Sequence, residues 1–199
     1  VPIIGGWWLV QALVAGLLTV PALYWVARGL FRRSPSLLAA LALAVSYHHV
    51  FFSQNSRGYA PLLLFSLLAT GLLVRALRTD AWWWWLGYAV AASLSAVSVP
   101  TGGFVLLGHA LAVAAALVVV RRAGGAARPL LGRAVAVYGV IGLVLLQAYA
   151  AVVSQVATAA EDAWSRPDAG FAPLSLDFAR GLLDDVSARG PLAATVAFI

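Results

Sequence analysis

Long apolar stretches separated by short polar connections make up most of this chain. A helix needs roughly 20 apolar residues to cross the hydrocarbon core of a membrane, which is about 30 Å thick. Six stretches approach or reach that length, over residues 6–26, 36–52, 60–77, 82–99, 103–120 and 134–156, and another begins near Pro191. Because lipid offers no hydrogen bonds to an open backbone, we expect helices. The pattern predicts an all-α fold, a polytopic transmembrane helical bundle of about six spans plus a partial seventh.

The same pattern divides the chain into three parts. Residues 1–156 are the predicted transmembrane bundle, residues 157–190 an extracytoplasmic loop, and residues 191–199 the start of a further span. The loop holds six of the seven acidic residues and includes SLDFARGLLDDVSA, whose apolar residues recur at helical spacing. This stretch is consistent with a surface helix along the membrane, but we favour the alternative that it is a solvated face that keeps the loop out of lipid.

Composition narrows the class of protein further. Hydrophobic residues make up 63% of the chain and charged residues 10%, and the mean hydropathy is +0.93. A soluble domain carries about 25% charged residues, so this is a membrane protein. The net charge of +6 comes from 13 arginines against seven acids. Because these arginines cluster between apolar runs, where they orient spans, we expect no nucleic-acid partner.

The arginines also predict an orientation. The connections after the first, third and fifth spans hold nine of them: Arg28, Arg32, Arg33, Arg75, Arg78, Arg121, Arg122, Arg128 and Arg133. The other connections hold Arg57 alone, a VPTG turn, and the acidic loop. Because positive residues favour the cytoplasmic side, the N-terminus is predicted to lie outside. Arginine in place of lysine, with abundant alanine, favours a bacterial inner (plasma) membrane as the location.

Neither disulfide nor metal chemistry is indicated. The chain has no cysteine, and His48, His49 and His109 show no zinc-binding spacing. We predict no metal site and no cofactor, and the use of a divalent metal stays open. The chain begins VPIIGGWW without methionine and ends in PLAATVAFI, so we expect it to be the central fragment of a longer protein.

Polar residues gather where the second predicted span ends, in SQNSRGYAPLLL. If the helix continues through Arg57, then Ser46, His49 and Ser53 share a face with it, because steps of three and four residues return to one side. Arginine keeps its charge and offers a planar fork of donors suited to phosphate. We interpret the stripe as a site for a lipid phosphate, with four candidate substrate-binding residues: Arg57, Gln54, Tyr59 and His49.

A simpler interpretation of the same residues remains open. Arg57 would anchor a helix end by reaching the headgroups, while Gln54 and Asn55 close a turn. His49 and His109 would each be packed or hydrogen-bonded within the bundle. Similarly, the four tryptophans Trp82 to Trp85 are predicted to lie at the headgroup level, as an aromatic belt rather than a sugar-stacking platform.

A family resemblance enters at these residues. An arginine-bearing turn precedes RSPSLLAALALA, the following span ends in a serine-glutamine and arginine-x-tyrosine pattern, and the next helix ends in RALR. With the pair of spans flanking VPTGG, these features resemble the GT-C glycosyltransferases. They are most similar to the protein mannosyltransferase and aminoarabinose transferase type, glycosyltransferase family 39 and its bacterial relatives. The likeness covers residues 6–156, and residues 53–59 are its specific part.

The resemblance implies a membrane enzyme with a polyprenyl-phosphate-linked sugar as donor. The sugar would pass, with inversion, to an envelope glycan, lipid or protein acceptor on the outer face. Gln54, Arg57 and Tyr59 would lie around the donor phosphate. In such enzymes a carboxylate in the first external loop is the general base, but this chain has no acid before Asp80. The catalytic residues are therefore unknown here, and the base is expected upstream of Val1.

Two other functions stay open. A transporter or lipid flippase would line a path with Arg57 and the histidines, although such proteins typically have broken helices and charges near the midplane, which the sequence does not indicate. A non-catalytic membrane assembly subunit would use small residues for helix contacts. In each case the partners include membrane lipid.

Overall fold

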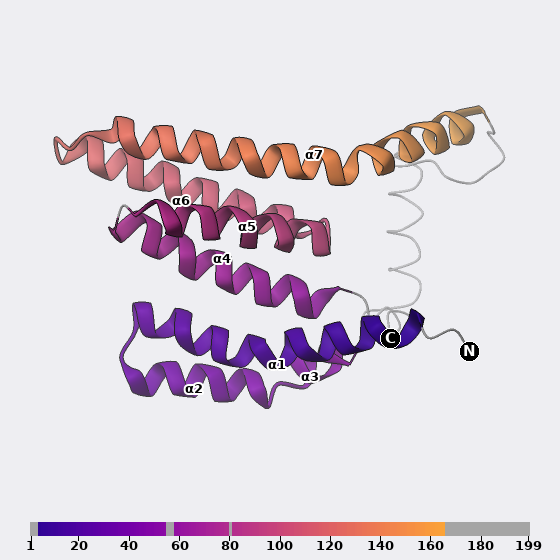
Figure 1. Cartoon of the computed structure of the whole chain (residues 1–199), viewed down its shortest axis with the longest axis horizontal. Helices are drawn as coiled ribbons and strands as arrows, with labels where there is room; N and C mark the ends of the chain where they lie inside the picture. The colour runs from indigo at the N-terminus through magenta and orange to yellow at the C-terminus, as the bar shows by residue number, and fades with distance from the viewer. Residues whose placement is uncertain (1–3, 55–57, 80, 166–199) are drawn as a thin grey trace, which may run out of the picture. The chain divides into compact units, whose positions relative to one another are not determined.

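The computed structural model describes residues 4–54, 58–79 and 81–165, and all regular structure in these ranges is helical (Figure 1). The helices are α1 (Ile4–Leu30), α2 (Arg33–Ala44), α3 (Tyr47–Ser53), α4 (Tyr59–Thr79), α5 (Trp82–Ser98), α6 (Gly102–Arg122) and α7 (Ala127–Ser165). Two compact units are present, residues 1–149 and 150–199. The predicted all-α class is confirmed, and the features below belong to the first unit.

Four helices of the described part are long and apolar enough to cross a membrane. These segments are Leu9–Leu30, Tyr59–Thr79, Gly102–Arg122 and Ala127–Ala150. The pair α2 and α3 adds a fifth crossing if the two count as one span. Helix α5 has 17 residues, which is about 25 Å of helix and shorter than the hydrocarbon core. The predicted count of about six spans is therefore not confirmed.

The second predicted span, residues 36–52, is bent rather than one continuous helix. Whether the helix could continue through Arg57 concerns residues outside the described ranges. Helices α2 and α3 meet at an angle of 59°, and Ser46 between them has an extended backbone (φ −68°, ψ 124°). The residues from Val45 to Ser53 are all valine, serine, tyrosine, histidine or phenylalanine, none of which is a strong helix former. The break comes just before α3, so Ser46, at the N-cap of α3, stays on the same side of it as His49, and both line one cavity.

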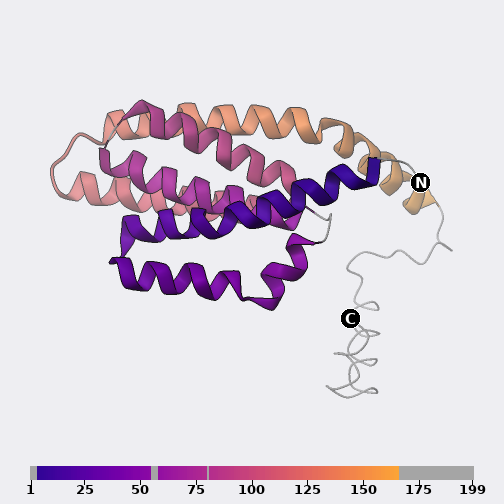
Figure 2. The ribbon, with the colours of Figure 1, turned by 60° about the horizontal axis from the view of Figure 1, so that its bottom comes forward.

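Helix α4 has the central position in this unit. It packs between α1 and α5 (Figures 1 and 2), while α2 and α3 pack on α1, and α6 packs on α4 and α5. Close approach depends on small residues: a Cβ at Gly71 of α4 would lie 2.6 Å from a ring carbon of Trp25 in α1. Between α4 and α7, the largest fully buried side chains are Trp85, Tyr88 and Ile141.

The arginine-bearing connections lie at one end of this unit. The turns between α1 and α2, α4 and α5, and α6 and α7 are all at the left in Figure 1. Helices α1, α4 and α6 each end with arginine in the last turn, where a cation interacts favourably with the helix dipole. This end is called the arginine end below. The opposite end, called the α3 end, carries α3 and the turn from α5 to α6.

The aromatic-belt prediction fails for one of the four tryptophans. Trp85 is fully buried in the core, whereas Trp83 is 78% exposed. Successive helical residues are rotated by about 100°, so four in a row surround the helix and cannot all face the headgroups. Position in sequence alone therefore misplaced Trp85.

The end of the described chain extends beyond the predicted bundle. Helix α7 continues to Ser165, so the first residues of the predicted loop 157–190 are helical. The rest of that loop, with its predicted surface helix, and the predicted span start at 191–199 lie outside the described residues.

Candidate lipid-donor site

A cavity borders α3 on each of two sides. The first, of about 220 Å³, lies against α1 and is lined by Leu13, Gly16, Leu17, Val20, Ala44, His49, Val50, Ser53 and Gln54. The second, of about 260 Å³, lies against α4 and is lined by Leu43, Ser46, His48, His49, Phe52, Tyr59, Ala60 and Leu63. Both are mainly apolar, and polar side chains enter them chiefly from α3.

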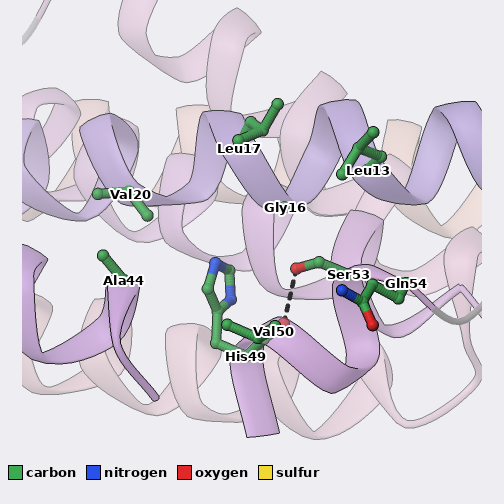
Figure 3. Close-up of a pocket in the computed structure, with 9 residues that line it drawn as sticks. All are labelled: Leu13, Gly16, Leu17, Val20, Ala44, His49, Val50, Ser53 and Gln54. Carbon is green, nitrogen blue, oxygen red and sulfur yellow. Dashed lines mark hydrogen bonds between the residues drawn. The ribbon is translucent and has the colours of Figure 1, made fainter. Parts of the chain in front are cut away.

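His49 is the one residue that borders both cavities in the described part of the chain. In Figure 3 its ring extends from α3 toward α1, whose Leu17 and Val20 line the same cavity. Gln54 lies at the other end of the first cavity, just past the end of α3. The cavity thus has an apolar wall from α1 and two side chains able to bind a polar head.

Ser53 of α3 lines the first cavity and faces the α1 wall. Its hydroxyl donates a hydrogen bond to the carbonyl of His49 at 2.6 Å, and the side chain is buried. It packs directly on Gly16 of α1, where an added Cβ would lie 2.5 Å from the Cβ of Ser53. Only glycine allows α3 to lie this close to α1, so Gly16 sets the depth of the first cavity.

Tyr59 reaches the second cavity from the first residue of α4. Its ring packs against Phe52 of α3, with centroids 4.8 Å apart, and the residue remains 39% exposed. The chain enters α4 through Gly58, whose φ of +79° and contact with the Ser98 carbonyl, 2.8 Å from a built Cβ, both require glycine. Tyr59 is thereby fixed at the α3 end of the bundle.

The structure brings three of the four predicted site residues around α3. His49, Gln54 and Tyr59 all line the two cavities. Arg57 lies outside the described residues. Sequence reasoning missed the apolar wall that α1 contributes through Leu17 and Val20. The small residues Ala12 and Gly16, four apart in the sequence, were the signal of a close helix approach.

A separate set of polar side chains lies in the core between α4, α5, α6 and α7. The hydroxyls of Ser66 and Ser95 are 2.8 Å apart, and Tyr88 donates to the hydroxyl of Tyr138 at 2.9 Å. Thr70 donates to the Ser66 carbonyl, so its oxygen accepts from Nε2 of His109 at 3.1 Å. His109 is packed in the core, away from both cavities.

No cluster of metal ligands is found in residues 4–54, 58–79 and 81–165, where no three His, Cys, Asp or Glu side chains come together. The side chains around α3 offer hydrogen-bond donors and acceptors beside apolar walls. Such a combination suits an amphiphile whose polar head lies near the α3 end.

Comparison with known proteins identifies the family. No curated protein and no solved structure matches the chain. The family model described as dolichyl-phosphate-mannose-protein mannosyltransferase matches residues 7–145, from α1 into α7. This match confirms the resemblance seen in the sequence and includes every residue that lines the two cavities. The chain belongs to the dolichyl-phosphate-mannose-protein mannosyltransferase family, whose members are membrane glycosyltransferases of the GT-C type.

Proposed function

We propose that this glycosyltransferase takes its sugar from a polyprenyl-phosphate carrier bound around α3. The observation that carries the proposal is the pair of apolar cavities flanking a short helix, with His49, Gln54 and Tyr59 at their polar edges. An isoprenoid chain needs apolar walls, and its phosphate needs hydrogen-bond donors nearby. The acceptor is an envelope glycan, lipid or protein on the outer face.

The bend between α2 and α3 supports this use. A broken helix exposes backbone groups, which a membrane protein tolerates where the break lines a cavity. Both cavities include residues from each side of the break: Ala44 and His49 in the first, Leu43 and His49 in the second. The interruption therefore makes room for a ligand at the place where a straight span would close it.

Arg57 is the proposed phosphate-binding cation, three residues beyond Gln54 and two before Tyr59 in the chain. When the sugar leaves the carrier, negative charge builds up on the departing phosphate. A fixed guanidinium stabilises that charge more strongly in the transition state than in the ground state, which lowers the barrier. We assign the general base to no residue of this chain.

The proposed orientation follows from the two ends of the unit. The arginine end faces the cytoplasm, because connections rich in arginine are retained on that side. The α3 end then faces outward in the inner membrane of a bacterium. Donor and acceptor meet at the outer surface.

The deciding experiment measures sugar transfer from a polyprenyl-phosphate donor in proteoliposomes. Arg57→Ala should lower the rate by about 100-fold or more, since loss of one transition-state donor has effects of that order. Arg121→Ala, at the arginine end, is the matched control and should leave the rate unchanged. Transfer at the wild-type rate in Arg57→Ala would remove the donor assignment.

A second candidate function is a lipid transporter or flippase. The bent pair of α2 and α3 favours it, because transporters often bind substrate at broken helices. The two functions separate in sealed vesicles that hold the donor on one side. Movement of the lipid without any glycosylated product would indicate transport, and product formation would indicate transfer.

A further inference from the structure

The turn between α1 and α2 gathers cations at the arginine end. Arg28, Arg32 and Arg33 lie on this turn, and all three are exposed. Arg78 reaches them from the last turn of α4, where its Nη1 donates to the carbonyl of Gly29 at 2.7 Å. No aspartate or glutamate occurs in the chain before Asp80, which follows Arg78 by two residues and lies outside the described residues. Three helices and the turn thus bring four guanidinium groups to one short segment.

The N-terminus of α2 adds further positive potential at the same place. The first turn of the helix contains no acid, and Arg32 forms no side-chain cap. The backbone N–H groups of Arg33 and Ser34 have no acceptor within the helix, and Pro35 has no N–H. Arginines beside the positive end of a helix dipole repel it. An anion bound here would interact favourably with the dipole, the free N–H groups and the side chains together.

Two of the arginines are held in place by backbone carbonyls. Arg28 Nη1 donates to the Phe31 carbonyl at 3.0 Å, and Arg78 is held on Gly29 as described. Each bond uses only one of the five N–H donors of its guanidinium. The remaining donors are available to an anion, and their positions are fixed relative to the start of α2.

An apolar surface continues from this cationic segment along α2. Leu37, Leu38 and Leu41 are 48%, 65% and 61% exposed, and the turn adds Phe31 at 62%. A soluble anion would leave these side chains uncovered. A lipid would cover them with its acyl chains while its headgroup meets the arginines, so the surface matches an amphiphile with a negative head.

We propose that the α1–α2 turn binds the headgroup of an anionic glycerophospholipid, such as phosphatidylglycerol. This site lies at the opposite end of α2 from the two cavities, which begin at Leu43 and Ala44. It is independent of the proposed donor site. Because Arg28 belongs to α1, Arg33 to α2 and Arg78 to α4, the bound lipid would hold three helices together.

Native mass spectrometry of the full chain, released from neutral nanodiscs with added phosphatidylglycerol or phosphatidylcholine, tests the site. The wild type should retain phosphatidylglycerol in preference to phosphatidylcholine. The double variant R32Q/R33Q should bind phosphatidylglycerol about 25-fold more weakly, at roughly fivefold per arginine. The control R121Q/R122Q removes the same charge from the same end, at the C-terminus of α6, and should stay within twofold of the wild type.

A second variant guards against misfolding of the first. Ser34→Glu places a carboxylate in the first turn of α2, which favours the helix and should still displace phosphatidylglycerol. Equal losses in R32Q/R33Q and R121Q/R122Q would show a diffuse basic surface and overturn the site, as would unchanged binding in Ser34→Glu. Displacement of the lipid by inorganic phosphate at millimolar concentration would refute the role of the apolar surface.

Discussion

The two sides of α4 are packed in different ways. Between α4 and α7 the core contains Trp85, Tyr88 and Ile141, each fully buried, and hydrogen bonds join helix to helix. Between α4 and α1 the buried cluster is smaller and consists of Ala15, Ala22, Ala60 and Leu64. The cavities occur on this second side, around α3.

The difference indicates that the two sides of the bundle have different roles. In lipid, helices associate through packing and hydrogen bonds, since burial of apolar surface gains little there. On the α4–α7 side, large interlocking side chains and hydrogen bonds hold the helices together. The α1–α3 side uses small residues and a short, broken helix, which leaves space that a ligand can fill. A packed wall beside an adaptable groove is a suitable arrangement for holding a long lipid carrier.

The largest expected effect comes from damage to the packed side. Trp85→Ala removes a fully buried side chain and should lower the free energy of unfolding by about 3 kcal/mol or more, because the surrounding helices cannot close the space. Unfolding by denaturant in mixed micelles measures this. Trp83→Ala, two residues earlier and 78% exposed, is the control and should change the stability by less than about 0.5 kcal/mol. Similar losses in both variants would contradict the description of this core.

The contrast between Trp83 and Trp85 separates what the sequence could predict from what it could not. Hydropathy and arginine positions predicted the helical class and the gathering of arginines at one end, because both follow from the membrane as solvent. They did not show which tryptophan is buried, since that depends on the rotation of α5 against α4 and α7. The break at Val45 and Ser46 was also missed, because an apolar run reads as one span whether or not its residues are good helix formers.

The site residues were predicted to lie together on one face of a continuous helix, and the structure brings them together in a different way. His49, Gln54 and Tyr59 do lie together, but through the bend that brings α3 between α1 and α4, not along a continuous helical stripe. The α1 wall of the first cavity comes from residues about 35 positions away in sequence. Gly16, which packs against Ser53, is a small residue that in the sequence indicates such a close contact.

The next largest effect is expected from Gly16→Ala, on the α1–α3 side. The new Cβ would overlap Ser53, so α3 must move away from α1, and overpacking of this kind costs about 1–3 kcal/mol. We expect a similar loss of stability and a weaker affinity for the polyprenyl-phosphate donor. Ser53→Gly in the same chain should restore both, which a double-mutant cycle would show as coupling. Gly108→Ala, at a position with open space around the Cβ, is the matched control. If Gly16→Ala binds the donor with wild-type affinity, the first cavity is not part of the donor site.

A smaller effect is expected where the two sides are joined. Arg75 of α4 lies with its guanidinium carbon 3.6 Å from the ring centroid of Trp25 in α1, and 5.7 Å from that of Trp84 in α5. Its Nη1 also donates to the Gly71 carbonyl at 3.2 Å. Arg75→Gln should cost about 1 kcal/mol, since it removes a partly buried cation–π contact. Arg122→Gln, exposed at the same end, serves as the control in the same unfolding measurement. If Arg75→Gln leaves the free energy of unfolding unchanged, the two sides are held together by packing alone.

The smallest expected effect tests whether hydrogen bonds or shape fix the packed side. Tyr138→Phe removes the acceptor of the Tyr88 hydroxyl, and Tyr88→Phe removes the donor, while both rings keep their places. Hydrogen bonds between helices in membranes are worth about 0.6 kcal/mol on average, so the coupling energy from the two single variants and the double variant should be of that size. A coupling near zero would show that the interlocking of Tyr88 with Trp85 and His109, whose ring centroids lie 6.5 and 5.5 Å away, determines this core. The packed side would then differ from the α1–α3 side by the size of its side chains and not by its polar contacts.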